Sequence, residues 1–271
     1  MSSKKEALLY GFNYLSDPRM RLNGCWNDAI GLTTLLTSAP YDFDSDHVTT
    51  VIDSKRIDYG RCTRHAMVES LKELAQRSID EHMEVAVVSF SGHGSHQRDL
   101  DGDELDGQDE GICPVDCKRV GLLIDDDLHD IFMSFNPTTR VYAIFDCCHS
   151  GSILDLPYRY PECIDGGSRP AAAAAADDKQ QQQQPRVVMI SGCRDSQTSA
   201  DAYNRSTHKY GGALTMALLR VLHEGTMYGR EPLGIFDMQK RVESILKAGG
   251  HRQFPLLSSS KPMTNDTVFL A

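Results

Sequence analysis

The sequence predicts one α/β domain whose largely parallel sheet is covered by helices on both faces. Short runs of β-branched and aromatic residues alternate along the chain with stretches in which apolar residues recur at helical spacing. That alternation is typical of strand–helix–strand units, which build parallel sheets. The two central runs, residues 85–90 and 141–145, are mostly apolar, as fully buried strands are. A chain of 271 residues is long enough for one large domain of this class.

The elements of the amino-terminal half follow from these patterns. We expect, in order, a strand over 7–14, a helix from 27 or 28 to 36, a strand over 47–52, a helix over 63–79, a strand over 85–91, a short helix over 127–135 and a strand over 141–145. Asn27 or Asp28 would cap the first helix, because both side chains accept hydrogen bonds from backbone N–H groups. Met67, Leu71 and Leu74 give the second helix its apolar face.

Residues 157–185 interrupt the alternation. Three prolines, a Gly-Gly pair, six consecutive alanines and five consecutive glutamines leave no face that could join a core, and a fourth proline ends the stretch. We therefore expect a flexible linker here. The pattern resumes afterwards with a strand over 186–191, helices over 211–222 and 234–246, and a short closing strand over 266–270.

Composition and charge restrict the partners and the compartment. The net charge of −10 argues against a nucleic-acid partner, which favours a basic face, and suits cations or basic substrates. The eight cysteines are scattered and two are adjacent, unlike the framework of a disulfide-rich domain. We find no signal peptide and no apolar run of transmembrane length. These features predict a reduced, soluble, cytoplasmic protein that contacts no membrane.

Two of the expected strands end in residues with catalytic chemistry. The strand over 85–91 is followed by His93 and Gly94, and the strand over 141–145 by Cys147 and Cys148. Open α/β sheets place their sites at the carboxyl ends of such strands. A cysteine becomes a nucleophile when a base takes its proton, and an imidazole on a neighbouring strand would supply that base. Alone, each residue is more often an ordinary buried thiol or polar side chain; together they predict a catalytic pair.

These two segments resemble a known family. Ser91-Gly-His-Gly94 and Asp146-Cys-Cys-His-Ser-Gly151 are similar to the His and Cys blocks of the metacaspases, cysteine peptidases with a caspase-like fold. The resemblance extends over nearly the whole chain and implies a caspase-like three-layer sandwich. In this family the nucleophile is the second residue after the aspartate, which is Cys148 here. Cys147 would then be a neighbouring auxiliary thiol. The caspase signature Gln-Ala-Cys-x-Gly is absent.

The resemblance also divides the domain into parts. Within the single domain over 1–271, it implies a larger catalytic part over 1–156, the linker over 157–185 and a smaller part over 186–271. Some members of the family cut themselves within this linker after a basic residue. The resemblance further implies peptide or protein substrates, and we expect a monomer.

The expected reaction is peptide hydrolysis after a basic residue. His93 would take the proton of Cys148, and backbone N–H groups around Gly94 and Cys148 would stabilise the oxyanion, since glycine allows a close approach. The resemblance places Cys25, Asp28, Ser91 and Asp146 around the pocket for the residue before the cut. Two carboxylates there would hold an arginine or lysine and repel an aspartate. Taken singly, Asp28 is explained equally well as a helix cap.

An acidic stretch follows the His segment. Residues 99–116 contain eight carboxylates and no basic residue, a composition most often found in solvated loops. Acids at EF-hand positions suggest calcium, but Glu104 occupies the position of the required glycine. The resemblance implies a different Ca²⁺ site, formed by Asp109, Asp125, Asp126 and Asp155. The alternative for residues 125–127 is helix capping.

Two other classes of function remain open. Cys113, Cys117, Cys147 and Cys148 would offer zinc its preferred sulfur ligands, although their spacing matches no paired Cys-x-x-Cys framework. A catalytically weak or inactive member that binds other proteins as a scaffold would keep the fold. The intact pair of His93 and Cys148 favours the peptidase over both.

Overall fold

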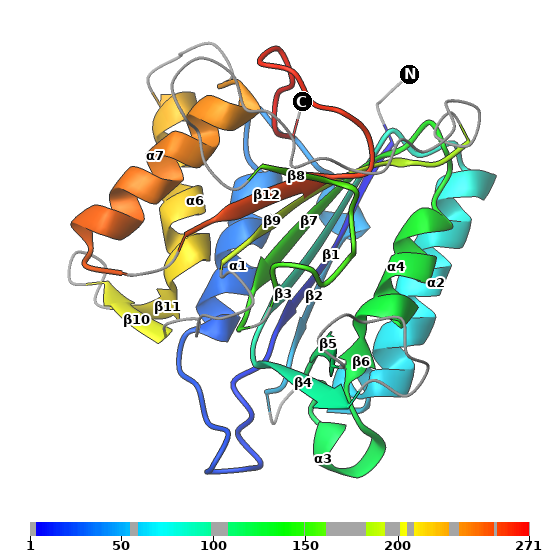
Figure 1. Cartoon of the computed structure of the whole chain (residues 1–271), viewed down its shortest axis with the longest axis vertical. Coiled ribbons are helices and arrows are strands. Elements are labelled where there is room, and N and C mark those ends of the chain that lie inside the picture. The colour runs from blue at the N-terminus through cyan, green and yellow to red at the C-terminus, as the bar shows by residue number, and fades with distance from the viewer. Residues whose placement is uncertain are drawn as a thin grey trace.

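A seven-stranded sheet forms the centre of the molecule, and Figure 1 shows helices on both of its faces. The computed structural model describes residues 4–54, 59–98, 108–148, 150–160, 183–192, 201–204, 209–227, 233–251 and 254–270. Across the sheet, the order is β2 (Val48–Ile52), β1 (Lys5–Gly11), β3 (Val85–Ser91), β7 (Arg140–Asp146), β9 (Arg186–Ser191), β12 (Leu256–Ser259) and β8 (Tyr158–Tyr160). The first five strands are parallel, whereas β12 and β8 run antiparallel to their neighbours.

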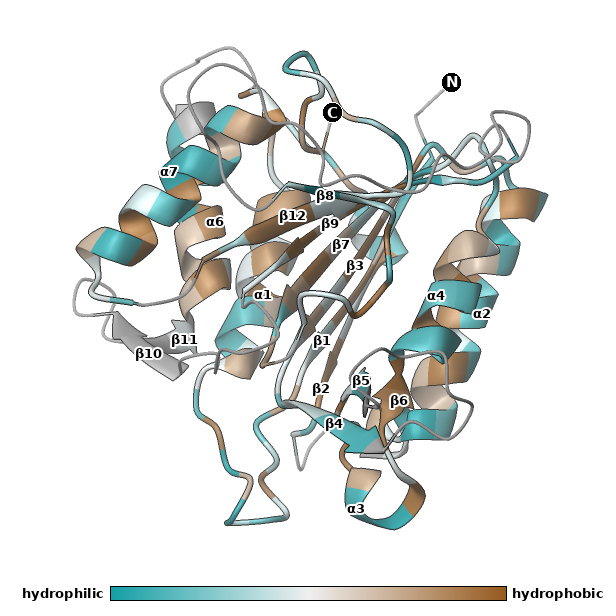
Figure 2. Cartoon of the chain, in the orientation of Figure 1, coloured by the Kyte–Doolittle hydropathy of each residue, from teal (hydrophilic) through white to brown (hydrophobic). Residues whose placement is uncertain are grey.

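The helices form one layer on each face of the sheet. One layer contains α1 (Cys25–Leu36), α6 (Ala213–Met227) and α7 (Ile235–Ala248), and the other contains α2 (Arg64–Asp80) and α4 (Asp125–Met133) (Figure 1). Successive side chains of a strand point to opposite faces, so the sheet divides the core into two clusters. In β3, for example, Val87 packs with α1 and α6, whereas Val88 packs with α2 and α4. The strands are apolar along most of their length in Figure 2, as expected for a sheet that is covered on both faces.

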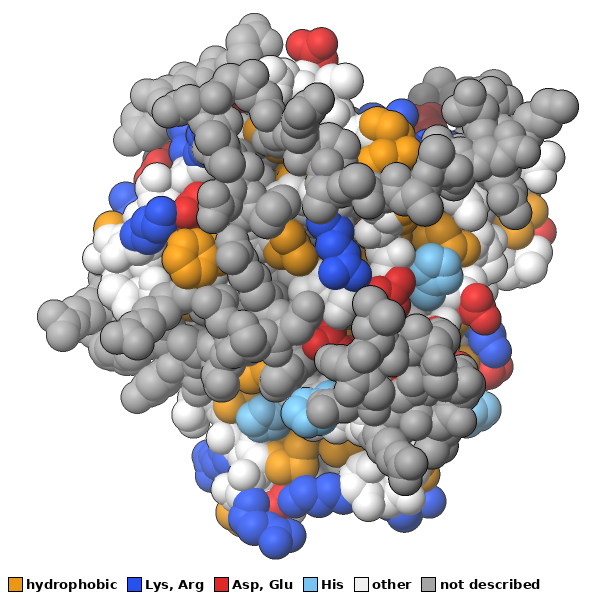
Figure 3. Space-filling view, in the orientation of Figure 1, with side chains coloured by type: hydrophobic (Ala, Val, Ile, Leu, Met, Phe, Trp, Pro, Cys, Tyr) orange, Lys and Arg blue, Asp and Glu red, His pale blue; other side chains and the backbone are white. Residues whose placement is uncertain are grey.

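Smaller elements lie around the carboxyl ends of the central strands. A three-stranded sheet is formed by β4 (Gly94–Arg98), β5 (Gln108–Ile112) and β6 (Leu123–Ile124), with the short helix α3 (Cys117–Val120) between the last two strands. A hairpin of β10 (Asp201–Asn204) and β11 (Lys209–Gly212) precedes α6. Two 3₁₀ helices, η1 (Ser45–His47) and η2 (Tyr59–Cys62), flank β2. Acidic and histidine side chains are visible around these strand ends in Figure 3.

The structure corrects several sequence-based expectations. Neither Asn27 nor Asp28 caps the first helix, because α1 begins earlier, at Cys25, and Gly24 is its N-cap. The helix expected from residue 127 begins at Asp125. The closing strand expected over 266–270 is wrong: Val268 forms only an isolated bridge to Gly234. The strand that joins the sheet is β12, whose sequence Leu-Leu-Ser-Ser lacks the β-branched residues and the alternation that identify a strand.

The expected linker is ordered at its beginning. Residues 158–160 form β8, which pairs with β12 at the edge of the sheet. Residues 161–182 lie outside the described residues, so the rest of this prediction is not tested. In the described part of the chain, no helix is both long and apolar enough to cross a membrane.

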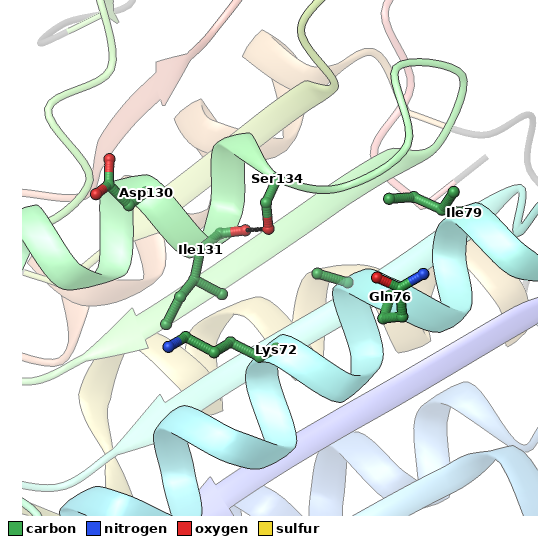
Figure 4. A pocket seen from close by; sticks show the side chains of 7 residues that line it. Lys72, Gln76, Ile79, Asp130, Ile131 and Ser134 are labelled. Carbon is green, nitrogen blue, oxygen red and sulfur yellow. Dashed lines mark hydrogen bonds between the residues drawn. The ribbon is translucent and has the colours of Figure 1, made fainter.

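A groove separates α2 from α4 on the outer side of their layer (Figure 4). Its labelled lining residues are Lys72, Gln76, Ile79, Asp130, Ile131 and Ser134. Nearby, the hydroxyl of Ser78 accepts a hydrogen bond of 2.9 Å from the backbone N–H of Asn136, which precedes β7. The groove therefore lies toward the amino ends of the strands, away from the ends that carry His93 and Cys148.

Candidate active site

The candidate site lies where β3 and β7 end side by side. The two strands are parallel neighbours, and their register places Ser91 opposite Asp146. The segments that carry His93 and Cys148 therefore leave the sheet at the same level. They also touch: a Cβ atom on Gly94 would overlap the carbonyl oxygen of Cys148. Only glycine allows this approach, so the two segments that the sequence analysis paired do lie against each other.

The two adjacent cysteines differ in burial. The Cys147 side chain is 0% exposed and belongs to the apolar cluster beneath α2 and α4. Cys148 is only partly buried. The carbonyl of Cys147 accepts a 2.9 Å hydrogen bond from the hydroxyl of Ser150, which keeps the turn after β7 closed. Of the two thiols, Cys148 is the one that a substrate can approach.

The imidazole of His93 is fixed on two sides. Its Nε2 atom lies 2.7 Å from the carbonyl oxygen of Met20, and its ring packs on that of Tyr14 with centroids 4.9 Å apart. A carbonyl oxygen only accepts hydrogen bonds, so Nε2 carries the proton. In the neutral ring, Nδ1 is then the nitrogen that can accept a proton. This tautomer suits a base that acts through Nδ1.

Tyr14 also holds the main chain at His93. The backbone N–H of His93 donates to the Tyr14 hydroxyl at 2.9 Å, and that hydroxyl donates to the carbonyl of Cys113 at 2.8 Å. The N–H of Cys113 in turn donates to the carbonyl of His93 at 2.9 Å. Burial raises the pKa of Tyr14 well above its ordinary value, so the phenol stays neutral and keeps its donor. These three hydrogen bonds tie together three distant segments of the chain.

Asp53 fixes the loop that carries Tyr14 and Met20. This buried carboxylate follows β2 and accepts hydrogen bonds from the N–H of Asn13 at 2.7 Å and from Nε1 of Trp26 at 2.6 Å. The N–H of Leu15 adds a third at 3.2 Å. The sequence analysis singled out neither Tyr14 nor Asp53. Their position just beyond the carboxyl ends of β1 and β2 is the signal that would have identified them.

The residues expected in the substrate pocket lie together. Asp28 accepts hydrogen bonds from the hydroxyl of Ser91 at 2.6 Å and from the N–H of Gly212 at 2.8 Å. Asp146 accepts one from the N–H of Thr215 at 2.7 Å. A Cβ atom on Gly212 would overlap the Asp146 carboxylate, so both acidic groups adjoin the same glycine. Two buried carboxylates thus flank the junction of β11 and α6.

Cys25 lies at the start of α1, beside this pair of carboxylates. Its side chain is buried, and its N–H donates to Oδ1 of Asn13 at 3.0 Å. A Cβ atom on Gly11 would overlap the carbonyl oxygen of Cys25, so the amino end of α1 packs directly on the end of β1. The main chain of Cys25 therefore lies beside the carboxyl end of β1, and its role in a pocket stays a prediction.

The expected calcium ligands lie on three neighbouring segments. Asp109 is in β5, Asp125 and Asp126 begin α4, and Asp155 follows the turn after β7 that carries Cys148, called the nucleophile turn below. Oδ2 of Asp125 accepts the N–H of Glu110 at 2.9 Å, which joins the first two segments. Burial, together with the nearby charge of Asp155, raises the pKa of Asp125 to about 6.

Present contacts engage some of these oxygens. Asp155 pairs with Arg159 at 3.3 Å, and Asp109 accepts from Gln97 at 3.3 Å. Among the residues that the structure describes, no three His, Cys, Asp or Glu side chains lie close enough to hold a metal ion. This finding also applies to Cys113, Cys117, Cys147 and Cys148, considered above for zinc. The donors suit a hard cation, since all four are carboxylates, but Asp155 would have to leave Arg159. Half of the acidic stretch, residues 99–107, lies outside the described residues.

Comparison with known proteins gives consistent matches. The family model for the metacaspase, peptidase C14 domain matches residues 5–157. Metacaspase-1 of Saccharomyces cerevisiae (strain ATCC 204508 / S288c) is 31% identical, over 99% of this chain and 69% of its own length. Metacaspase-1 of Yarrowia lipolytica is 32% identical, over 99% of this chain and 64% of its own length. Metacaspase-5 of Trypanosoma brucei brucei is also 32% identical, over 95% of this chain and 51% of its own length.

A solved structure matches the fold. The crystal structure of a protein from Geobacter sulfurreducens superposes with a TM-score of 0.63, covering 96% of this chain and 95% of the other at 24% identity. At that identity the likeness concerns the fold alone. It agrees with the expected three-layer arrangement around a mostly parallel sheet.

Proposed function

The chain belongs to the metacaspase family of cysteine peptidases, and we propose that it cuts peptide bonds after arginine or lysine, using Cys148 and His93, in a calcium-dependent manner. The observation that carries this proposal is the contact between Gly94 and the carbonyl of Cys148, because it brings the base and the nucleophile to one edge of the sheet. The partial exposure of Cys148, against the full burial of Cys147, supports Cys148 as the nucleophile.

The reaction begins with a proton transfer. Nδ1 of His93 takes the Cys148 proton, while the Met20 carbonyl retains the proton on Nε2. The thiolate attacks the peptide carbonyl, and the N–H groups of Gly94 and Cys148 stabilise the resulting oxyanion, each worth about 3 kcal/mol when well placed. The imidazolium then protonates the leaving amine. Water, activated by the same imidazole, hydrolyses the acyl-enzyme and restores the thiol.

Specificity for basic side chains is supported by the two buried carboxylates. Asp28 and Asp146 adjoin Gly212 at the edge of the sheet where the nucleophile lies. A guanidinium or an ammonium group would form charge-assisted hydrogen bonds with them, whereas an aspartate of a substrate would be repelled. The chain's net charge of −10 also favours the approach of basic substrates.

Calcium is proposed to bind Asp109, Asp125, Asp126 and Asp155. Repulsion between Asp125 and Asp155 adds to burial in raising the pKa of Asp125. A bound calcium ion would offset this repulsion with its positive charge. Arg159 supplies part of that charge now. Asp155 has a φ of 41°, in the left-handed region that aspartate adopts at some cost. Asp155 lies seven residues after Cys148, in the loop beside the nucleophile.

We also propose that the protein is a monomer, lies in the cytoplasm and acts on proteins. Among the described residues, the sheet edge formed by β8 is three residues long, and so short an edge offers little for pairing with a second copy. Size-exclusion chromatography with light scattering tests the oligomeric state.

Peptide hydrolysis tests the proposed activity. Peptides that differ only in having arginine, lysine or aspartate before the scissile bond are incubated with the full chain, with calcium or with a chelator. We expect the unsubstituted chain to cut after arginine and lysine when calcium is present. The Cys148→Ala variant should cut none of these peptides. Failure of the unsubstituted chain to cut any basic peptide in calcium would contradict the proposal and favour a non-catalytic binding role.

A further inference from the structure

Two cysteines outside the proposed catalytic pair lie four residues apart on one tight turn. Cys113 follows β5 and is buried, whereas Cys117 begins α3 and is partly buried. The N–H of Cys117 donates to the carbonyl of Pro114 at 3.0 Å, and this tight turn folds the second cysteine back toward the first. The two thiols interact electrostatically across this turn. The zinc interpretation does not account for this pair, since no third ligand joins it among the described residues.

The pKa values of the two thiols are shifted in opposite directions. The interaction with Cys113, with help from the N–H and the charge of Lys118, lowers the pKa of Cys117 to about 7 despite partial burial. The same interaction, together with burial, raises the pKa of Cys113. A partly exposed thiol that loses its proton readily, beside a thiol that keeps its proton, is the arrangement in which an oxidised sulfur is captured by its neighbour.

Cys113 is also joined to the candidate active site. Its N–H donates to the carbonyl of His93 at 2.9 Å, and its carbonyl accepts the Tyr14 hydroxyl at 2.8 Å. Cys113 and Cys147 belong to the same buried apolar cluster, and the charges of Cys147 and Cys148 act on the Cys113 thiol. Movement of Cys113 therefore changes two of the hydrogen bonds that hold the main chain at His93.

We propose that Cys113 and Cys117 form a reversible disulfide when the protein meets a peroxide, and that this bond loosens the hold on His93. The Cys117 thiolate attacks one peroxide oxygen, the O–O bond breaks, hydroxide leaves and Cys117 becomes a sulfenic acid. The Cys113 sulfur then attacks the Cys117 sulfur, its proton and the sulfenic OH leave as water, and the S–S bond forms. Two electrons pass from the thiols to the peroxide. A dithiol reverses the reaction by exchange.

The bond requires the two residues to move. Sulfur atoms in a disulfide are about 2.05 Å apart, well inside the spacing of two unbonded thiols. Closing the bond draws Cys113 toward α3, away from the nucleophile turn. We expect the oxidised enzyme to be less active; this second step rests on the proposed peptidase function, whereas formation of the disulfide does not.

Mapping of the disulfide uses the full chain carrying Cys148→Ala, which keeps the proposed nucleophile out of the oxidation. The protein is treated with a small excess of hydrogen peroxide, free thiols are alkylated, and a protease that cuts before Asp116 separates the two cysteines. Mass spectrometry should find Cys113 and Cys117 in one linked species that dithiothreitol separates. Cys117→Ser in the same background should remove it. Sulfinic acid at Cys117, or a link from Cys113 to Cys147 instead, would overturn the proposal.

Activity provides the second measurement. The otherwise unsubstituted enzyme and Cys117→Ser are treated alike, so direct oxidation of Cys148 affects both equally. The unsubstituted enzyme should lose severalfold more activity and recover it with dithiothreitol. Equal losses, with the linked species present, would overturn the coupling to His93. A reduced enzyme that cuts no basic peptide contradicts the proposed function, and the mapping still decides whether the disulfide forms.

Discussion

Nε2 of His93 donates to the main-chain carbonyl oxygen of Met20 across 2.7 Å, although Met20 lies 73 residues earlier in the chain. The orientation of the proposed base therefore depends on the loop between β1 and α1. Tyr14 and Asp53 are two side chains that hold this loop. Substitutions of these two residues test whether the loop positions the base.

Tyr14→Phe keeps the ring beside His93 and removes the hydroxyl that links His93 to Cys113. Each buried polar group left without a partner costs about 1–3 kcal/mol, so the free energy of unfolding should fall by about that amount or more. We expect kcat to fall severalfold while KM changes little. Urea unfolding and steady-state kinetics measure both. Tyr142→Phe is the matched control, since its hydroxyl bonds Val268 at 3.4 Å on the other side of the sheet. Equal effects of the two substitutions on kcat would contradict the prediction.

Asp53→Asn replaces an acceptor of three N–H groups by a carboxamide that has one oxygen and an added donor. Hydrogen bonds to a charged group contribute about 1.5–3 kcal/mol, and we expect a loss of stability on the order of 3 kcal/mol. The pH dependence of kcat/KM should also change, because the surroundings of His93 change. Asp44→Asn, at an exposed carboxylate that caps η1, is the control. An unaltered pH profile in folded Asp53→Asn would show that Asp53 does not position the base.

Cys148→Ala should reduce peptide hydrolysis by at least about 10³-fold, as expected when a nucleophile is removed. Cys147→Ala should leave a substantial fraction of the activity and lower stability by about 1 kcal/mol, because it empties a small volume in the apolar core. Kinetics and thermal unfolding of the two variants distinguish these effects. An inactive Cys147→Ala with an active Cys148→Ala would reverse the assignment.

Asp28→Asn retains an oxygen that can accept from Ser91 and Gly212, so the fold should persist. The substitution removes the charge that would hold a basic side chain, worth about 1.5–3 kcal/mol, or about 10- to 100-fold in kcat/KM for an arginine substrate. Hydrolysis of arginine and aspartate peptides by both proteins is the measurement. Efficient cleavage after aspartate by the unsubstituted enzyme would eliminate the acidic pocket.

Calcium activation should require about 10⁻⁴–10⁻³ M, the range of flexible carboxylate sites, and magnesium should substitute poorly because it needs a tighter octahedral shell. Replacing Asp125 and Asp126 together by alanine should remove the response and leave a folded protein. The matched control replaces Asp101 and Asp103, which should matter far less. Calcium titrations of activity, with circular dichroism to monitor folding, provide the comparison. Full activity in excess chelator would refute the site.

The central strands could be predicted from the sequence because burial on both faces imposes a local pattern. The runs expected at 85–91, 141–145 and 186–191 match β3, β7 and β9 within one residue at each end. The position of His93 and Cys148 at neighbouring strand ends followed from this pattern. In contrast, β12 contributes no such pattern, because its partners β9 and β8 decide where it lies.

The surroundings of the site could not be predicted, because they depend on contacts between distant segments. Asp28 was expected as a helix cap or a pocket residue, and the structure shows it holding Ser91 and Gly212. The role of Tyr14 depends on a left-handed backbone, with φ of 52°, that no local residue pattern indicates. The proximity of Cys113 and Cys117 depends on a turn, and its relation to His93 is visible only in three dimensions.

The hydrogen bonds of the two pocket carboxylates have a consequence for synthesis of the protein. Asp28 is bonded to Gly212, 184 residues later, and Asp146 to Thr215, 69 residues later. Translation proceeds at about 5–20 residues per second, so a growing chain contains His93 and Cys148 for several seconds before these amide donors are made. During that interval the proposed pocket is incomplete. We therefore expect a ribosome producing this enzyme to carry an unfinished peptidase, with a complete pocket only after the chain has passed Thr215.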